Sequence, residues 1–378
     1  MKRLFLLCLL GMLTISSLHA ANVVPQPPNI NAENYLLIDA ASGQILAEEN
    51  VDERINPASI TKIMTSYVVA DSIAKGRISL DDEVFISDNA YQAEGSTTYL
   101  EINTRVKLID LLRGLIIQSG NDAAIALAEH VAGNEEAFAS LMNEYAKELG
   151  LNNTNYRNST GYTDDMHYTT ARDIATLSKA LINDFPVHYA MYKEKEFTYN
   201  NIKQSNRNNL LWRDDSIDGI KTGHTEAAGY CLAASAKKKG MRLITVVLGT
   251  NSAKARINAS QTLLNYGFSF FEAKTLYSPG QTIFEQRVWK AEQENVGLSS
   301  KHAVAVTIPR GRYQDLKISS NIPAQIIAPL SKDSVVGNLE ISLDNKIIAS
   351  AHLYPVSDIE QAGIFKRAID SMKLWFAD

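Results

Sequence analysis

The sequence of 378 residues has few features that would indicate a disulfide framework, a metal site or a nucleic-acid partner. Its net charge is −5 and its interior holds no long basic stretch, which argues against nucleic-acid binding. Of two cysteines, Cys8 lies in the N-terminal leader, so the exported chain would hold one thiol, Cys231, and no intramolecular disulfide. The histidines follow no metal-ligand spacing, and we predict neither a metal nor another cofactor. After the leader, no stretch is apolar and long enough to span a bilayer.

The first twenty residues have the pattern of an export signal. Two basic residues precede an apolar run from Leu4 to Leu18, and Ala20-Ala21 supplies small residues for cleavage. The alternative is an uncleaved membrane anchor, but the apolar run is short and contains polar residues. We therefore predict a signal peptide over residues 1–20 and an exported protein.

The rest of the chain divides into two regions. Strand patterns at both ends of residues 30–272 enclose a series of helical patterns, which predicts one α+β domain. A hairpin is expected at its start, and a helix from Arg256 to Phe271 at its end. Its last strands are expected over residues 218–223, 230–236 and 242–248. Residues 273–356 contain short β-rich stretches separated by turns, and predict a small all-β domain.

The last segment, residues 357–378, is amphipathic. Its positive charges come from Lys366, Arg367 and Lys373, and one broad face can collect Ile359, Phe365, Ile369, Met372, Trp375 and Phe376. One interpretation is a helix that lies in a membrane interface, with the terminal Trp-Phe pair as an anchor. The alternative is a helix packed on its own domain or at a dimer contact.

A buried helix that starts near Asn56 carries the first candidate for chemistry. Asn56 and Pro57 have the pattern of an N-cap followed by proline at the first helical position, and most later residues are apolar. Ser59 and Lys62 interrupt the apolar run three residues apart, so they project from one face. A desolvated lysine has a lowered pKa and can take a proton from a neighbouring hydroxyl, which would make Ser59 a nucleophile. The alternative is a capping serine beside a lysine that extends to solvent.

Spacing alone does not distinguish this pair. Ser-x-x-Lys also occurs at Ser72/Lys75 and Ser235/Lys238, and we expect both of these at solvated ends of secondary structure. A second motif, Ser119-Gly-Asn121, lies at a break between two predicted helices, where a hydroxyl and an amide can both point into a cleft.

A third motif, Lys221-Thr-Gly223, occurs once in the chain and lies in a predicted strand. Lys221 and Gly223 face the same side of that strand. The glycine would let a substrate backbone lie close, the lysine would hold a carboxylate, and Thr222 would donate a hydrogen bond.

In this order the three motifs resemble the signature of the penicillin-binding proteins and serine β-lactamases. Nearly the whole exported chain is similar to the low-molecular-mass D-alanyl-D-alanine carboxypeptidases of the penicillin-binding protein 5 type. The similar stretches are Pro57-Ala-Ser-Ile-Thr-Lys-Ile-Met-Thr65, Gln118-Ser-Gly-Asn-Asp-Ala123, Tyr192-Lys-Glu-Lys-Glu-Phe197, Asn206-Arg-Asn208 and Asp218-Gly-Ile-Lys-Thr-Gly-His-Thr225. The resemblance implies an antiparallel sheet flanked by helices, then a small β-domain and an amphipathic C-terminal helix.

The resemblance also implies an activity, the removal of the terminal D-alanine from peptidoglycan pentapeptides. Ser59 would attack the peptide carbonyl with Lys62 as base, and water would hydrolyse the acyl-enzyme. Ser119 and Lys221 would relay the proton to the leaving amine, while Asn121 would hold the substrate amide. The same nucleophile would be acylated by β-lactam antibiotics. Such an enzyme is expected in the periplasm, peripheral on the outer face of the inner membrane.

Further roles follow from the resemblance for the residues around the third motif. Backbone N–H groups of Ser59 and His224 would hold the oxyanion. Thr222 and Arg207 would bind the free carboxylate of the terminal D-alanine. Alternatives remain for two of them, a structural salt bridge for Arg207 and simple packing for His224.

One departure concerns deacylation. The family's best-known members have a Val-His-Gly sequence after the third helix, whereas this chain has Asn158-Ser-Thr-Gly161, so Thr160 replaces the histidine. A deacylation role for that histidine is therefore not transferred. A D,D-endopeptidase, a β-lactamase and a non-catalytic binding protein are the alternative functions. Residues 156–167 contain no glutamate that could deacylate a β-lactam, and the intact motifs argue against a non-catalytic protein.

Overall fold

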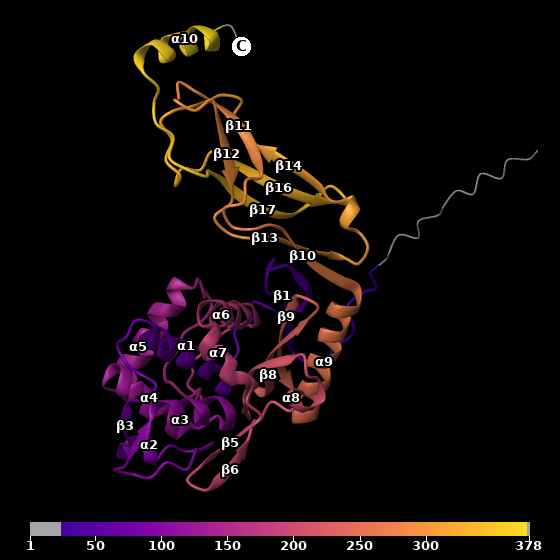
Figure 1. Cartoon of the computed structure of the whole chain (residues 1–378). Coiled ribbons are helices and arrows are strands. Elements are labelled where there is room, and N and C mark those ends of the chain that lie inside the picture. Colours follow the sequence, from indigo (N-terminus) through magenta and orange to yellow (C-terminus); the bar gives the residue numbers. More distant parts are fainter. Residues whose placement is uncertain (1–23, 376–378) are drawn as a thin grey trace, which may run out of the picture.

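The computed structural model describes residues 24–375. The predicted signal peptide and Phe376 lie outside the described residues. The described chain is elongated: an α+β region occupies one end, a β region follows it, and the helix α10 lies at the far end of the β region (Figure 1).

A five-stranded antiparallel sheet forms the centre of the first region, with the strand order β2-β1-β9-β8-β7. The predicted hairpin and the three predicted last strands are all confirmed. Their bounds are β1 Asn34–Asp39, β2 Ile45–Glu49, β7 Ile217–Thr225, β8 Gly229–Lys238 and β9 Met241–Thr250. The predicted closing helix is α9 (Ala253–Phe270), which packs against β8 and β9 on one face of the sheet.

The other face of the sheet supports a larger helical core. Its central element is α1 (Lys62–Ala74), in which every residue from 62 to 70 is buried. The helices around it are α2 Asp88–Tyr91, α3 Leu108–Arg113, α4 Asn121–Ala132, α5 Glu135–Glu148, α6 Ala171–Asp184 and α7 Pro186–Tyr189. Two small hairpins lie at its edge, β3 Glu83–Phe85 with β4 Arg105–Lys107, and β5 Glu196–Tyr199 with β6 Ile202–Ser205; the short helix α8 Leu210–Arg213 follows.

Two predicted helix starts are wrong. The sequence predicts a helical pattern from Val106 to about Leu149, but the first helix of this stretch begins at Leu108, because Val106 pairs with Val84 in the β3–β4 hairpin. Pro57 is not the first residue of an α-helix either. A 3₁₀ turn, Ala58–Thr61, precedes α1, and the Asn56 side chain accepts a hydrogen bond from the backbone N–H of Ala58.

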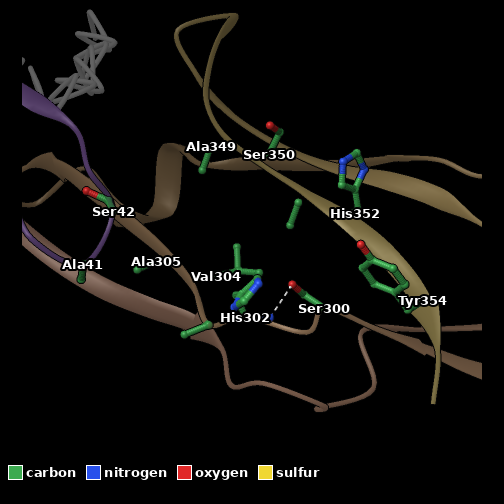
Figure 2. Close-up of a pocket in the computed structure, with 12 residues that line it drawn as sticks. Ala41, Ser42, Ser300, His302, Val304, Ala305, Ala349, Ser350, His352 and Tyr354 are labelled. Carbon is green, nitrogen blue, oxygen red and sulfur yellow. Dashed lines mark hydrogen bonds between the residues drawn. The ribbon is translucent and has the colours of Figure 1, made fainter. Parts of the chain in front are cut away.

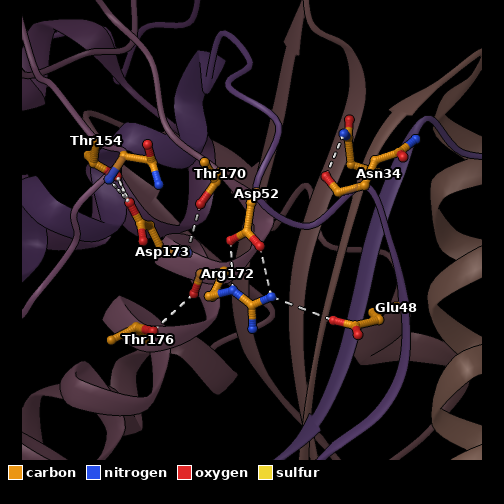
Figure 3. A network of polar contacts seen from close by, with 10 residues as sticks. Asn34, Glu48, Asp52, Thr154, Thr170, Arg172, Asp173 and Thr176 are labelled. Carbon is orange, nitrogen blue, oxygen red and sulfur yellow. Dashed lines mark hydrogen bonds and ion pairs between the residues drawn. The ribbon is translucent and has the colours of Figure 1, made fainter.

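The start of α6 is fixed by a network of polar contacts (Figure 3). Thr170 caps the helix by accepting a hydrogen bond from the Asp173 backbone N–H. Arg172 forms two hydrogen bonds to Asp52 and an ion pair with Glu48, which ties α6 to the end of the β1–β2 hairpin.

The β region has its own hydrophobic core and begins where α9 passes directly into β10. β10 Phe271–Tyr277 pairs with β13 Val304–Pro309, and a six-stranded sheet has the order β14-β16-β17-β12-β11-β15. The bounds of these strands are β11 Phe284–Trp289, β12 Asn295–Ser299, β14 Lys317–Asn321, β15 Ile326–Ile327, β16 Gly337–Leu343 and β17 Lys346–Pro355.

The two regions meet at the turn that joins β1 and β2. Ser42 Oγ lies 2.7 Å from Thr307 Oγ1 of β13, and a cavity of about 320 Å³ opens beside this contact. Figure 2 shows Ser42 on one side of the cavity, with His302, His352 and Tyr354 of the β region on the other sides.

The predicted C-terminal helix is shorter than expected. α10 covers Ile364–Trp375, whereas the residues before it complete the β region. Ile359 is buried in that core and forms a β-bridge with Leu330, so it does not belong to the amphipathic face as predicted. Among the described residues, no helix combines the length and hydrophobicity that a membrane crossing requires.

Candidate active site

Ser59 and Lys62 lie together at the start of α1. The 3₁₀ turn before the helix places Ser59 one turn ahead of Lys62, and the lysine Nζ donates a hydrogen bond to Ser59 Oγ over 3.1 Å. Lys62 is 1% exposed, and its Nζ also donates to Asn121 Oδ1 and to the Thr160 carbonyl oxygen, each at 2.6 Å. The lysine therefore does not extend to solvent.

Burial governs the charge of this lysine. It lowers the pKa of Lys62 to about 7, with a further lowering from the Arg207 guanidinium and opposing effects from the Asp122 and Glu135 carboxylates. About half of such side chains are neutral near pH 7. A neutral amine in hydrogen-bond contact with a serine hydroxyl can act as a general base.

The other two Ser-x-x-Lys pairs lack this arrangement. Lys75 and Lys238 are exposed at their ends and form ion pairs with Asp71 and Asp214. The prediction of solvated ends is right for these lysines and wrong for the serines, because Ser72 and Ser235 are buried. In neither pair is the lysine hydrogen-bonded to the serine; Ser235 Oγ instead accepts from Arg242.

The second motif lies where α3 and α4 are joined by a π turn, Gly114–Gln118. Ser119 follows this turn in the left-handed conformation, with φ 64° and ψ 32°, which is strained for a residue other than glycine. Its Oγ is buried and forms no hydrogen bond within the described structure. Asn121 begins α4, accepts from Lys62 and donates through Nδ2 to the Glu94 carbonyl oxygen. The break in the helix thus presents both side chains to the cleft, as predicted.

The third motif lies on β7 next to the turn that carries Ser59. Lys221 is buried, and its Nζ donates to the Thr222 carbonyl oxygen over 3.1 Å. Burial, with the nearby charges of Lys62, Arg207 and Arg256, holds the pKa of Lys221 well below its ordinary value.

Gly223 has a structural reason that the sequence did not indicate. A Cβ at this position would come within 3.0 Å of Ile60 and 3.1 Å of the Pro57 carbonyl oxygen. The missing side chain therefore lets β7 pack against the turn that carries Ser59. The prediction that it makes room for a substrate backbone stays a prediction.

Two hollows flank Ser59. One, of about 220 Å³, is lined by Ser59, Ser96, Ser119, Arg207, Thr222, Gly223, His224, Tyr230 and Arg256. The other, of about 320 Å³, is lined by Ser59, Gly95, Ser96, Asn121, Thr160, Gly161, Tyr162, Thr163, His224 and Thr225. The first hollow is cationic because two guanidinium groups reach it, and the second is neutral. A substrate with a terminal carboxylate therefore fits with that carboxylate in the first hollow.

The geometry also bears on the alternatives for Arg207 and His224. Arg207 forms no ion pair within residues 24–375 and lines the cationic hollow, which favours ligand binding over a structural salt bridge. The His224 ring lies on Tyr230, with 3.9 Å between ring centroids, and it also lines both hollows. His224 therefore both packs against Tyr230 and lines the hollows beside Ser59.

Arg256 is a site residue that the sequence analysis missed. It comes from the first turns of α9, is buried, and donates to the Gly223 and Cys231 carbonyl oxygens at 2.9 and 3.3 Å. It belongs to no motif. The available signal was an arginine at the start of an otherwise weakly charged helix, and only the fold, in which that helix packs on β8 and β9, places the arginine beside Gly223.

Comparison with known proteins agrees with this site. Residues 21–252 match the peptidase S11 family, described as D-alanyl-D-alanine carboxypeptidase. The chain belongs to this family. Residues 271–361 match a second family, the C-terminal domain of penicillin-binding protein 5.

Individual relatives cover almost the whole chain. D-alanyl-D-alanine carboxypeptidase DacC of Escherichia coli is 45% identical over 94% of this chain and 91% of its own length. The crystal structure of penicillin-binding protein 5 from Haemophilus influenzae is 42% identical, with a TM-score of 0.86 over 89% of this chain and all of that chain. Penicillin-binding protein D2 of Listeria monocytogenes in its ampicillin-bound form is 28% identical, with a TM-score of 0.59 over 64% of this chain and all of that one.

These findings confirm two predictions. The fold is the predicted α+β penicillin-binding fold followed by an all-β domain and a short final helix. The protein is a serine-type D-alanyl-D-alanine carboxypeptidase, a hydrolase of the cell wall.

Proposed function

We propose that Ser59 is the nucleophile of this carboxypeptidase and that neutral Lys62 is its base. The observation that carries the proposal is the buried contact between Lys62 Nζ and Ser59 Oγ at 3.1 Å. As Ser59 Oγ bonds to the carbonyl carbon of the terminal D-Ala-D-Ala peptide bond, its proton passes to Lys62. Backbone N–H groups of Ser59 and His224 are the proposed donors to the resulting oxyanion.

The leaving amine must then receive a proton. Ser119 and Lys221 are the proposed relay, because Ser119 Oγ is buried without a hydrogen-bond partner among the described residues and Lys221 lies on the adjoining strand. The carbon–nitrogen bond breaks, D-alanine departs as a neutral amine, and an ester of Ser59 remains. Asn121 is proposed to hold the substrate amide. Water then attacks the ester and returns the proton to Ser59.

The cationic hollow is the proposed site for the substrate carboxylate. Thr222 and Arg207 are its predicted ligands, and Arg256 adds a second guanidinium, a buried one, to the same wall. A carboxylate held by two cations fixes the end of the chain, so cleavage is directed at the terminal peptide bond. The proposed substrate is a peptidoglycan stem peptide that ends in D-Ala-D-Ala.

The same nucleophile is the proposed target of β-lactam antibiotics. A Listeria monocytogenes relative with this fold is known in an ampicillin-bound form, which supports the proposal. We expect incubation with a labelled penicillin to add one label to Ser59, detected by peptide mass spectrometry. Ser59→Ala should abolish the label, while Ser72→Ala, a change in another Ser-x-x-Lys motif, should retain it. Stable labelling of Ser59→Ala would refute the assignment.

Carboxypeptidase and endopeptidase activities need a separate measurement. Incubation with a disaccharide pentapeptide should release free D-alanine and leave a product shorter by one residue. Cleavage confined to cross-linked dimers would instead support the endopeptidase.

We also propose that α10 holds the enzyme peripherally on the outer face of the inner membrane. Its apolar side chains Ile364, Phe365, Ile369 and Met372 are exposed, whereas Asp370 on the opposite face is buried and accepts a hydrogen bond from the Lys290 backbone. The apolar face therefore points away from the protein, next to the positive charges of Lys366 and Lys373. α10 also lies at the end of the molecule remote from the active site (Figure 1).

Co-sedimentation with vesicles of anionic phospholipid tests this proposal. A chain that ends at Gly363 should stay in the supernatant, whereas the full chain should sediment and keep the same activity on a soluble peptide. Ile318→Ser, a change at an exposed apolar residue of β14, serves as the control and should sediment like the full chain. Equal sedimentation of the shortened chain would exclude the anchor.

A further inference from the structure

The loop that carries Thr160 is hydrogen-bonded to one carboxylate, that of Glu135. Glu135, in the first turn of α5, accepts hydrogen bonds from the backbone N–H and the hydroxyl of Ser159, at 3.0 and 2.5 Å. Ser159 is completely buried, so each of these bonds replaces a contact with water that the loop cannot make.

The same loop also accepts hydrogen bonds from side chains of α1. Thr65 donates to the Ser159 carbonyl oxygen and Lys62 donates to the Thr160 carbonyl oxygen, both at 2.6 Å. The next residue, Gly161, has φ +87°, and a Cβ there would lie 1.8 Å from the Ala58 carbonyl oxygen. The position of the Thr160 carbonyl is therefore determined by Glu135 on one side and by the turn before α1 on the other.

The charged groups that face Lys62 come from several elements. Glu135 of α5 and Asp122 of α4 favour its protonated form, and Arg207 disfavours it. The charge of Lys62 in turn contributes to lowering the pKa of Lys221 on β7 and the pKa of His167, in both cases after burial as the larger cause. Asp122 already accepts from the backbone N–H groups of Thr98, Leu100 and Ala123, which fixes another loop of the cleft. Glu135 differs from Asp122 because the loop that it holds contains the Thr160 carbonyl oxygen, which accepts a hydrogen bond from Lys62.

We propose that Glu135 is a positioning residue for Lys62: through Ser159 it places the Thr160 carbonyl against Nζ, and its negative charge favours the protonated lysine. The inference rests on the function proposed above for Lys62. It assigns two separable effects to one side chain, a hydrogen-bonding effect and an effect of charge. Two substitutions separate them.

Glu135→Gln keeps an oxygen that can accept both Ser159 hydrogen bonds but removes the negative charge. Loss of an anion that favours protonated Lys62 lowers its pKa, so the acidic limb of the kcat/KM profile should move to lower pH by roughly half a unit. The plateau of the profile should stay within about twofold of the wild type. The measurement is release of D-alanine between pH 5 and 9.

Glu135→Ala removes the acceptor as well as the charge. The loop loses its lower support, so the plateau itself should fall by roughly tenfold, with most of the loss in kcat. Ser159→Ala keeps one of the two hydrogen bonds and should fall between the wild type and Glu135→Ala.

Glu136→Gln is the matched control. Glu136 lies in the same turn of α5 and is exposed, and within residues 24–375 its side chain forms no hydrogen bond or ion pair with the loop, so the same loss of charge should leave the pH limb unmoved. An unmoved limb in Glu135→Gln, or an equal movement in Glu136→Gln, would overturn the proposal. If Glu135→Ala fails to fold, the pH profile of Glu135→Gln still tests the proposal.

Penicillin labelling separates this inference from the function on which it rests. Every Glu135 variant that folds should still be labelled at Ser59, only more slowly where the plateau is reduced. Wild-type protein labelled at a residue other than Ser59 would refute the proposed function. Normal labelling of Ser59 combined with an unmoved pH limb would refute only the role of Glu135.

Discussion

The two regions of the molecule treat buried charge differently. The α+β region buries the lysines Lys62 and Lys221, the guanidinium of Arg256, and the carboxylates Asp39, Asp122 and Asp173. In the described part of the β region, Asp370 is the one charged side chain that is buried. It accepts a hydrogen bond from the Lys290 backbone and so attaches α10 to the β region.

Burying a lysine without a full ion pair costs free energy, and a protein retains such a group where it is used. Both buried lysines of the α+β region lie within the three motifs around Ser59. The β region, in contrast, has an ordinary apolar core formed by its strands. The distribution of buried charge therefore separates the region that performs chemistry from the one that supports it.

The largest effect is expected from Lys62→Ala, which removes the proposed base. The value of kcat/KM should fall by about 10³–10⁴-fold, because among residues 24–375 only Lys62 holds a basic nitrogen in hydrogen-bond contact with Ser59 Oγ. Lys75→Ala, a change at the residue that ends the same helix as its C-cap, is the comparison. The Lys75 side chain is 58% exposed in its ion pair with Asp71, so activity should not change and the free energy of unfolding should change little. Similar losses of activity in both variants would show that burial does not distinguish the two lysines.

Acid should destabilise the α+β region through His167. This histidine is buried and bonded to Thr61 Oγ1, and burial lowers its pKa to about 4. The unfolded chain therefore binds this proton more readily than the folded chain does. The stability is present above about pH 6.5 and decreases by roughly 3 kcal/mol as the pH falls toward 4.

Denaturant unfolding between pH 4 and 7 measures this loss. Burial also lowers the pKa of His188 to about 4, so His167→Asn should reduce the pH dependence without abolishing it. His352→Asn, a change at an exposed residue of the β region, should leave it unchanged. If both variants retained the wild-type slope, the assignment to His167 would be wrong.

A smaller effect is expected from Arg207→Ala, which removes one cation from the carboxylate hollow. On a substrate with a free terminal carboxylate, kcat/KM should fall by about 10–100-fold, the value of a charge-assisted hydrogen bond. An analogue that ends in a carboxamide has no carboxylate to hold. Wild type and variant should therefore differ little on the analogue, and an equal loss on both substrates would show that Arg207 acts on the fold instead.

The smallest effect is expected where the regions meet. Ser42→Ala leaves the buried Thr307 hydroxyl without its partner and should lower the free energy of unfolding by about 1–2 kcal/mol. Activity on a soluble peptide should be unchanged, because the contact lies outside both hollows that flank Ser59. A clear loss of activity would show that the β region influences the active site.

The sequence predicted most of the strands and all three motifs because these depend on local pattern. Alternation, turn residues and short spacings are visible without the fold, and β7, β8 and β9 lie where the pattern placed them. The sequence does not show that a 3₁₀ turn precedes α1, because that turn is packed against β7, which lies far away in the chain. Ile359 was assigned to the amphipathic helix because spacing alone cannot show that it pairs with Leu330.

The supporting residues of the site were beyond prediction for a related reason. Arg256 and Glu135 come from helices outside the three motifs. Arg256 lines the carboxylate hollow and donates to the Gly223 carbonyl oxygen, whereas Glu135 acts through Ser159. Contacts of this kind join residues of different elements and follow no fixed spacing, so no sequence pattern indicates them. The charge of Lys62 depends on these distant groups, so its lowered pKa could be expected in direction but not traced to its sources.

The π turn before Ser119 makes the length of this part of the chain critical. A π turn contains one residue more than an α-helical turn. Removing any one residue from 114–118 would allow α3 to continue as a regular helix, and each residue of such a helix rotates the next side chain by about 100°. Ser119 would then leave the cleft and Asn121 would turn away from Lys62. This short segment therefore tolerates substitutions that fit its packing, but neither an insertion nor a deletion.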